Sequence, residues 1–337
     1  MKKFLATAIA LTIGAAACVF TACAGENDDG TYTVYAPDGA PALALANAVN
    51  EDDDRYDFHI VASNAITAQV QGEEPAADFC ILPVNVAAKL LGKGETYQML
   101  GTVTNGNMYL LTTGGNPEIT TDNLSTLVGK TVGVVQLNNV PGLTFQAVLS
   151  RNDIDYQILG NDVEAASDKV NLQAFADAST VTPASGCDYY LCPEPAATGK
   201  INGTASSANP FKLAGSLQTL YDGENGYPQA VLVAKTSVIE EAKSVVDTFI
   251  TYMEGSADFL ASASAADVVA LLEDCYTEGM TPSLNANNLN ATVIANCSVY
   301  FTAAQDCKSR VNAFLAELID LNAEFTSAVS DSFYYAG

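Results

Sequence analysis

Short apolar segments alternate with polar turns and helix-like segments through most of the chain after residue 30. The first such unit has a predicted strand over 31–36, a polar turn and a helix over 41–49. Strands over 58–62 and 78–82 open the next two units. Strands that alternate with helices are typical of a parallel α/β sheet. Residues 79–82 are apolar throughout, as a strand buried on both faces requires.

A second series of the same kind follows an apolar strand predicted over 108–113. Its expected elements are helices over 121–127 and 143–149 and strands over 131–135, 156–159 and 188–191. A strand over 229–234 then returns the chain to the first series. Two series joined by two crossing strands predict an α/β protein of two lobes, each a doubly wound sheet, with a cleft between them. The expected boundaries are 31–110 with 228–337 for lobe I and 111–227 for lobe II.

The last hundred residues predict helices, because apolar residues recur there at spacings of three and four. The stripes are Ile239, Ala242, Val246, Phe249, Ile250 and Met253, and then Val311, Phe314, Leu315, Leu318 and Phe325. We expect both stripes to pack into the core. One interpretation of 289–321 is a segment that wraps across the first lobe.

The N-terminus has the pattern of a signal peptide. Lys2 and Lys3 precede an uncharged stretch over 4–20, which is short and rich in alanine for a membrane span. The stretch ends in FTAC, which resembles a lipobox with Cys23 as the lipidated residue, although Phe20 stands where leucine is usual. We therefore expect a signal helix over 1–22 and a lipidated tether over 23–30. Plain secretion, a retained membrane anchor and lipidation at Cys18 are the alternatives.

Composition narrows the classes of partner. The formal net charge is −25, and the sequence has no cluster of lysine and arginine, so a phosphate backbone would be repelled. We expect no nucleic-acid partner. Apolar residues make up 49% of the chain and charged residues only 16%, which indicates a globular protein. Its length suits two lobes better than one core.

Cysteine and histidine usage limits the chemistry. Six cysteines follow Cys23, an even number that permits disulfides outside the cytoplasm. A bridge between Cys187 and Cys192 is rejected, because the intervening strand would span about 16 Å. Two of Cys275, Cys297 and Cys307 could pair, or all could be free. With His59 as the single histidine, a histidine-based metal site or catalytic triad is not expected.

The turns that follow the predicted strands supply the candidate ligand-binding residues. In open α/β sheets, ligands bind beyond the carboxyl ends of the strands. Each turn also begins a helix, whose unpaired N–H groups can hold a polar ligand. The candidates on these turns are Asp38, Gly39, Ala40, Pro41, Asn64, Asn85, Asn139, Val140, Pro141, Gly142 and Glu194. Three further candidates are Asn107, just before the strand over 108–113, and Tyr227 and Gln229, near the second crossing.

Most of these residues also have a structural interpretation. Gly39 could serve a tight turn and Pro41 a helix start, while Asn64 and Asn85 could cap their own helices. Glu194 could be a solvated turn carboxylate. Tyr109 and Phe145 could stack on a ring, but packing in the core is favoured. His59 lies inside an apolar strand, so a packed, non-catalytic histidine is expected.

Segments in the same order make the sequence resemble a known family. They are VYAPDGAPAL (34–43), ILPVN (81–85), LGTV (100–103), NMYLL (107–111), GKTVGV (129–134), NVPGLTF (139–145), PEPAA (193–197), YPQAVLV (227–233) and FYY (333–335). With this order the chain resembles the type II substrate-binding lipoproteins of ABC transporters, in the branch that includes sulfonate, nitrate, taurine and thiamine-pyrimidine binders. The resemblance implies a Venus-flytrap fold that captures a small molecule by lobe closure and delivers it to a permease.

The function expected from this resemblance is that of a transport receptor on the outer face of the cytoplasmic membrane or in the periplasm. Its expected partners are a small-molecule ligand, an ABC permease with its ATPase, and the membrane through the lipid anchor; a monomer without cofactor, metal or catalytic residues is expected. A ligand sensor without transport and a pyrimidine-synthase-like enzyme are the alternatives. No arginine is placed for an anion, so a neutral or heteroaromatic ligand is slightly favoured over a sulfonate or nitrate.

Overall fold

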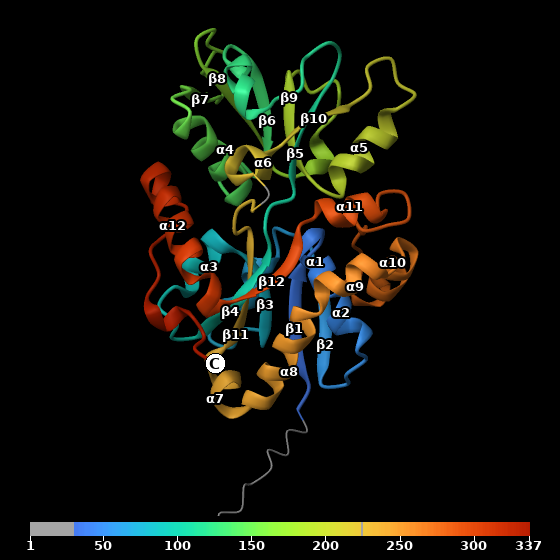
Figure 1. Cartoon of the computed structure of the whole chain (residues 1–337), viewed down its shortest axis with the longest axis vertical. Helices are drawn as coiled ribbons and strands as arrows, with labels where there is room; N and C mark the ends of the chain where they lie inside the picture. Colours follow the sequence, from blue (N-terminus) through green and yellow to red (C-terminus); the bar gives the residue numbers. More distant parts are fainter. Residues whose placement is uncertain (1–29, 224) are drawn as a thin grey trace, which may run out of the picture.

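The computed structural model describes residues 30–223 and 225–337, which form two six-stranded sheets one above the other in Figure 1. The expected signal helix and lipidated Cys23 lie outside the described residues. The first sheet has the order β12-β4-β11-β3-β1-β2. Its strands are β1 (Tyr32–Pro37), β2 (Tyr56–Val61), β3 (Phe79–Pro83), β4 (Tyr97–Thr104), β11 (Ala230–Lys235) and β12 (Val299–Ala303). β1 is parallel to β2 and β3, whereas β11 is antiparallel to β3 and β4.

The second sheet repeats this mixed arrangement in the order β10-β5-β9-β6-β8-β7. Its strands are β5 (Met108–Thr112), β6 (Thr131–Val135), β7 (Tyr156–Ile158), β8 (Val170–Phe175), β9 (Tyr189–Pro193) and β10 (Lys212–Ser216). β6 is parallel to β8 and β9, and β5 is antiparallel to β9 and β10. The prediction of a two-lobed α/β fold with two sheets is therefore confirmed.

Helices surround both sheets (Figure 1). The α-helices are α1 (Ala40–Ala44), α2 (Ala46–Asn50), α3 (Val84–Leu91), α4 (Val140–Arg151), α5 (Ala196–Thr204), α6 (Leu217–Asp222), α7 (Thr236–Glu241), α8 (Lys243–Glu254), α9 (Ser256–Ser262), α10 (Ala265–Leu272), α11 (Ala291–Asn296) and α12 (Ala304–Asn322). The 3₁₀ helices are η1 (Ile66–Val70), η2 (Thr121–Leu127), η3 (Ala178–Thr180), η4 (Glu273–Cys275) and η5 (Asp331–Phe333). Among the described residues, no helix combines the length and apolar character that a bilayer crossing needs.

The chain passes between the sheets twice. It leaves the first sheet at Thr104 and enters the second at Met108, and it returns through α6 and the loop before β11. The boundary expected after residue 110 falls within β5. Met108 already pairs with Pro193 of β9, so the whole of β5 belongs to the second sheet.

Four strands were not expected from the sequence: β4, β8, β10 and β12. The case of β12 is instructive, because every one of its residues is half-buried and the strand lies at the sheet edge beside β4. Its positions do not alternate between buried and exposed, and its sequence, VYFTA, is only five residues long. The helices on either side of β12 then dominate the local pattern.

The C-terminal region does more than wrap across the first lobe. Helix α12 packs against β4 of the first sheet and against α4 beside the second sheet. Its buried face includes Val311, Phe314, Leu315 and Leu318, which confirms the core interpretation of these four positions. Phe325 is different, because α12 ends at Asn322 and leaves Phe325 in the following turn.

The six cysteines of the described residues all carry free thiols, so no pair forms among Cys275, Cys297 and Cys307. Cys192 lies inside strand β9 and Cys187 precedes that strand. Burial raises the pKa of the Cys187 and Cys275 thiols to about 11, which leaves them protonated and unreactive near neutral pH.

Candidate functional site

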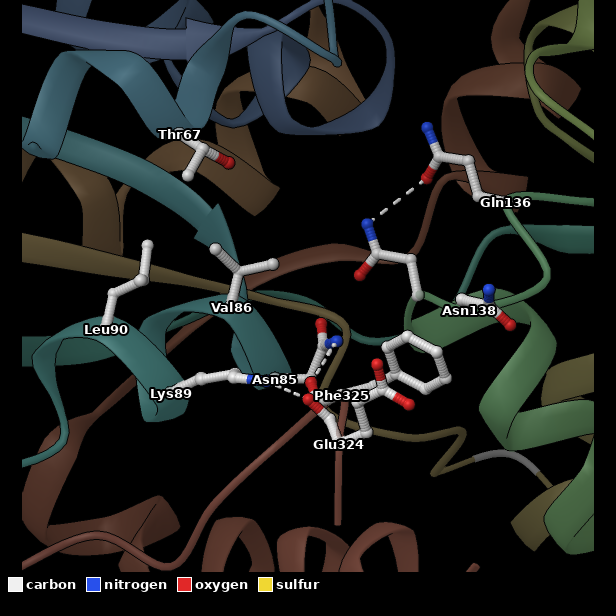
Figure 2. A pocket seen from close by; sticks show the side chains of 10 residues that line it. Thr67, Asn85, Val86, Lys89, Leu90, Gln136, Asn138, Glu324 and Phe325 are labelled. Atoms are coloured by element: carbon white, nitrogen blue, oxygen red, sulfur yellow. Dashed lines mark hydrogen bonds between the residues drawn. The ribbon is translucent and has the colours of Figure 1, made fainter. Parts of the chain in front are cut away.

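A pocket of about 380 Å³ lies between elements of the two sheets (Figure 2). This volume falls within the range of roughly 300–1,000 Å³ that small-molecule sites occupy. The first sheet contributes η1 and α3, the second contributes the turn between β6 and α4, and the chain after α12 closes one side. The lining residues are Thr67, Asn85, Val86, Lys89, Leu90, Gln136, Asn138, Asn139, Glu324 and Phe325.

Asn85 is the most buried polar group of the pocket, with only 2% of the residue exposed. It lies in the first turn of α3, whose N-cap is Pro83, so Asn85 does not cap its own helix. Its Nδ2 donates to the carbonyl oxygen of Phe325 at 3.0 Å. Its Oδ1 is buried without any hydrogen-bond partner among the described residues. A buried carbonyl left in this state costs about 1–3 kcal/mol, which a bound donor would recover.

Asn139 is a second candidate residue that lines the pocket. It is the N-cap of α4, and its Oδ1 accepts a hydrogen bond from the Val140 N–H at 2.9 Å. Its Nδ2 points to Gln136 Oε1 at 3.5 Å, a long contact that a ligand could replace. Gln136 has a φ of 55°, the left-handed region that non-glycine residues rarely adopt. Such strain is often found at binding sites.

Sequence reasoning missed Gln136 and Asn138, and it missed the wall made by the C-terminal segment. Lys89 Nζ donates to the Glu324 carbonyl oxygen, and Asn85 holds the Phe325 carbonyl, so two side chains of α3 fix this wall. The polar run QLNN at 136–139 was a visible signal. Nothing in the local sequence places Glu324 or Phe325 here, because they lie about 240 positions from α3 in the chain.

The turn at residues 38–41 does not line this pocket. The Asp38 carboxylate accepts hydrogen bonds from the Tyr276 hydroxyl at 2.8 Å and from the Ser283 N–H and hydroxyl at 3.0 and 2.9 Å. These donors come from the segment between η4 and α11, which covers the turn. Gly39 and Ala40 are buried, and Pro41 is half-buried at the start of α1. The φ of 104° at Gly39 supports the tight-turn interpretation.

Residues 140–142 are buried in the first turn of α4 and do not reach the pocket. A Cβ atom on Gly142 would lie 2.0 Å from the Leu137 carbonyl oxygen, so glycine is required by packing. Asn64 is exposed and does not line the pocket; it does not cap η1, because the N-cap there is Ala65. Its neighbour Thr67 reaches the pocket instead.

Glu194 has a structural partner. Its carboxylate accepts hydrogen bonds from the Thr198 N–H at 2.9 Å and the Thr198 hydroxyl at 2.7 Å, in the first turn of α5. Only 4% of the residue is exposed. Glu194 is therefore not a solvated turn carboxylate, and its oxygens already have protein donors.

Asn107, Gln229 and Tyr227 belong to the crossing segments. Asn107 and Gln229 bind each other, and Asn107 Nδ2 also donates to the Glu194 carbonyl oxygen at 2.8 Å. Tyr227 is fully buried and stacks on Phe314, with ring centroids 5.9 Å apart. Burial raises the pKa of Tyr227 well above its ordinary value. These side chains therefore stabilise the two segments that connect the sheets.

Phe145, Tyr109 and His59 are held by packing and by contacts within the protein. Phe145 is fully buried in the core. The Tyr109 hydroxyl donates to the Asn296 carbonyl oxygen at 3.2 Å. His59 stacks on Tyr35 with ring centroids 4.7 Å apart, but its side chain is 29% exposed and lies 3.0 Å from Asp57. His59 is thus packed on one face and open to solvent on the other.

Comparisons with known proteins give the same fold. The sequence matches no protein-family model and no curated protein. A crystal structure of an ABC transporter from Parabacteroides distasonis is 18% identical, with a TM-score of 0.68 over 91% of this chain and 99% of that one. The periplasmic aliphatic sulphonate binding protein of Escherichia coli is 12% identical, with a TM-score of 0.56 over 87% of both chains.

The ligand binding component of an ABC-type import system from Staphylococcus aureus, solved with zinc bound, is 10% identical with a TM-score of 0.56. The match covers 91% of this chain and 96% of the Staphylococcus aureus chain. Within residues 30–223 and 225–337, no group of three His, Cys, Asp or Glu side chains is arranged to hold a metal ion. This chain shares the two-lobed fold of these three structures.

Proposed function

We propose that this protein is an extracytoplasmic solute-binding lipoprotein of an ABC importer. It captures a small polar or heteroaromatic molecule between its lobes and delivers it to a membrane permease and its ATPase. The observation that carries this proposal is the pocket, which is built from both sheets and contains the unpartnered carbonyl of Asn85. A ligand that bonds α3 and the turn before α4 at once would favour the closed arrangement of the two lobes.

The pocket supports binding more than catalysis. Its ionisable side chains are Lys89 and Glu324, and the Lys89 ammonium group is already bonded to the Glu324 carbonyl oxygen. Neither His59 nor any described cysteine lines it. General acid–base or nucleophilic chemistry would need such groups within reach of a substrate. Amide side chains suit recognition, because each offers both a donor and an acceptor.

Purified protein comprising residues 24–337 tests the proposal. A ligand that binds only the folded state adds RT ln(1 + [L]/Kd) to the free energy of unfolding, so thermal unfolding should shift upward. Native mass spectrometry of freshly purified protein should first be used to look for a retained small molecule. Asn139→Trp should abolish the ligand-dependent shift while the protein stays folded.

Asn64→Trp is the matched control, because Asn64 is exposed and outside the pocket. It should keep the shift. Binding that survives Asn139→Trp and is lost in Asn64→Trp would show that the ligand binds elsewhere.

A further inference from the structure

Asn85 Oδ1 has no hydrogen-bond partner among the described residues, so it indicates what kind of ligand the pocket can bind. An asparagine amide can be drawn in two orientations, but the hydrogen-bond network fixes this one. The group 3.0 Å from the Asn85 amide is the carbonyl oxygen of Phe325, which can only accept a hydrogen bond. The NH₂ group must therefore face Phe325, and the carbonyl Oδ1 is directed into the pocket, as Figure 2 shows. A ligand reaching this atom must bring a hydrogen.

Several of the donors that an oxyanion could use are already engaged. The Val84 N–H at the start of α3 donates to the Gln229 carbonyl oxygen at 3.0 Å. At the start of α4, the Val140 N–H is bonded to Asn139, and Pro141 has no N–H. Lys89 is held on the Glu324 carbonyl oxygen. The first N–H of α3, the first N–H of α4 and the cation are thus engaged, and the bare Asn85 carbonyl would repel a sulfonate.

The rest of the lining favours a flat, uncharged molecule. Gln136, Asn138 and Asn139 carry primary amides, whose paired donor and acceptor complement the adjacent N–H and C=O of an amide or lactam. Val86, Leu90 and the ring of Phe325 supply the apolar part of the lining. The Phe325 ring lies between the α3 side and the turn before α4 in this view (Figure 2).

We propose that the pocket selects uncharged amides or lactams, which donate an N–H to Asn85 Oδ1, and discriminates against oxyanions. This inference rests on the proposed solute-binding function and adds the ligand class. It separates this chain from its structural neighbour in Escherichia coli, which is described as an aliphatic sulphonate binding protein.

The test measures binding by isothermal titration calorimetry on residues 24–337. The donor probes are 2-pyridone, uracil and nicotinamide, each paired with its fully N-methylated counterpart, which lacks the N–H. Methanesulfonate, benzenesulfonate and nitrate are the oxyanion probes, and D-xylose is a probe that offers only hydroxyl donors. We expect at least one N–H probe to bind about tenfold or more tightly than its methylated counterpart, with no binding of the oxyanions or of xylose.

Two variants connect this preference to Asn85. Asn85→Leu should reduce the preference for N–H over N-methyl to about onefold. Because Asn85→Leu also loses the bond to Phe325, Ser327→Ala serves as the control. It removes another hydrogen bond between the C-terminal segment and α3, from the Ser327 hydroxyl to the Ala88 carbonyl oxygen. Ser327 does not line the pocket and the variant keeps the Asn85 carbonyl, so it should retain the preference.

The outcomes separate the two proposals. Binding of an oxyanion or of xylose in preference to the N–H probes would overturn the ligand class and leave the solute receptor in place. Equal binding of methylated and unmethylated probes, or a preference that survives Asn85→Leu, would overturn the role of Asn85. Failure of every probe, together with no molecule retained on purification, would count against the receptor function itself.

Discussion

Asn107 and Gln229 bind each other in both directions, although they lie on the two different segments that connect the sheets. The Asn107 backbone N–H donates to Gln229 Oε1 at 3.1 Å, and Gln229 Nε2 donates to Asn107 Oδ1 at 2.7 Å. Each connecting segment thus satisfies polar groups of the other where the chain passes between the lobes. Both residues were candidates for ligand binding, but their hydrogen-bonding groups serve the crossing itself.

Replacing Gln229 by methionine should destabilise the protein. The change keeps the length of the side chain but leaves Asn107 Oδ1 and N–H without their partner. Since Asn107 is only 2% exposed, we expect a loss of about 1–3 kcal/mol in the free energy of unfolding, measured in urea. Gln71→Met, at an exposed position, should change it by less than about 0.5 kcal/mol. Equal effects would contradict the role of the pair.

Gly142→Ala should destabilise the protein although alanine favours helices. The added Cβ would lie 2.0 Å from the Leu137 carbonyl oxygen, so the backbone before α4 must move. Overpacking of this kind costs about 1–3 kcal/mol, which thermal or urea unfolding would detect. Gly203 in α5 has open space around its Cβ position, so Gly203→Ala should instead stabilise by about 0.4–1 kcal/mol. A stabilising Gly142→Ala would refute the packing argument.

Arg151 and Glu317 form an ion pair between α4 and α12 that also involves Tyr221 of α6. Arg151 Nη2 lies 2.6 Å from Glu317 Oε2, and its guanidinium stacks over the Tyr221 ring at 4.1 Å from the centroid. A double-mutant cycle with Arg151→Met and Glu317→Gln should give a coupling energy of about 0.2–1 kcal/mol, since Arg151 is 44% exposed. The coupling should shrink between 0.05 and 1 M salt; a coupling that grows with salt would exclude an electrostatic origin.

Asp53 should contribute to stability only above acidic pH. Hydrogen bonds from Arg55 lower the pKa of the Asp53 carboxyl to about 2 from its usual 3.8. Since the folded-state pKa is lower than that of the unfolded chain, the contribution is complete above pH 4 and is lost as the pH falls toward 2. Asp53→Asn should therefore be less stable than the parent at pH 6, with the difference closing by pH 2. A stability difference that stays constant from pH 6 to pH 2 would contradict this role of Asp53.

Cys23 provides a test of the anchor in the full-length chain expressed in bacteria. The parent protein should incorporate labelled palmitate and fractionate with membranes, whereas Cys23→Ser should lose the label and become soluble outside the cytoplasm. Cys18→Ser should behave like the parent. Loss of the label in Cys18→Ser but not in Cys23→Ser would show that Cys18 is the lipidated residue.

The sequence was a good guide to elements with strong local signals and a poor guide to the site. Apolar runs such as 79–82 predicted buried strands, because a strand covered on both faces needs apolar residues at every position. Most candidate residues lie on turns after strands, and of these Asn85 and Asn139 line the pocket. Glu194 and Asp38 also lie on such turns, but their carboxylates already have protein donors. Thr198 donates to Glu194, and Ser283 donates to Asp38.

The sequence by itself determined the α/β class and the two series of strands, since both depend on neighbouring residues and their periodicity. Only the tertiary structure decided which polar turns remain available to a ligand. It did so through contacts between distant segments: the Phe325 carbonyl fixes the orientation of Asn85 across 240 positions of chain. Whether a buried amide has a partner depends on packing between lobes and termini, and no local pattern encodes that.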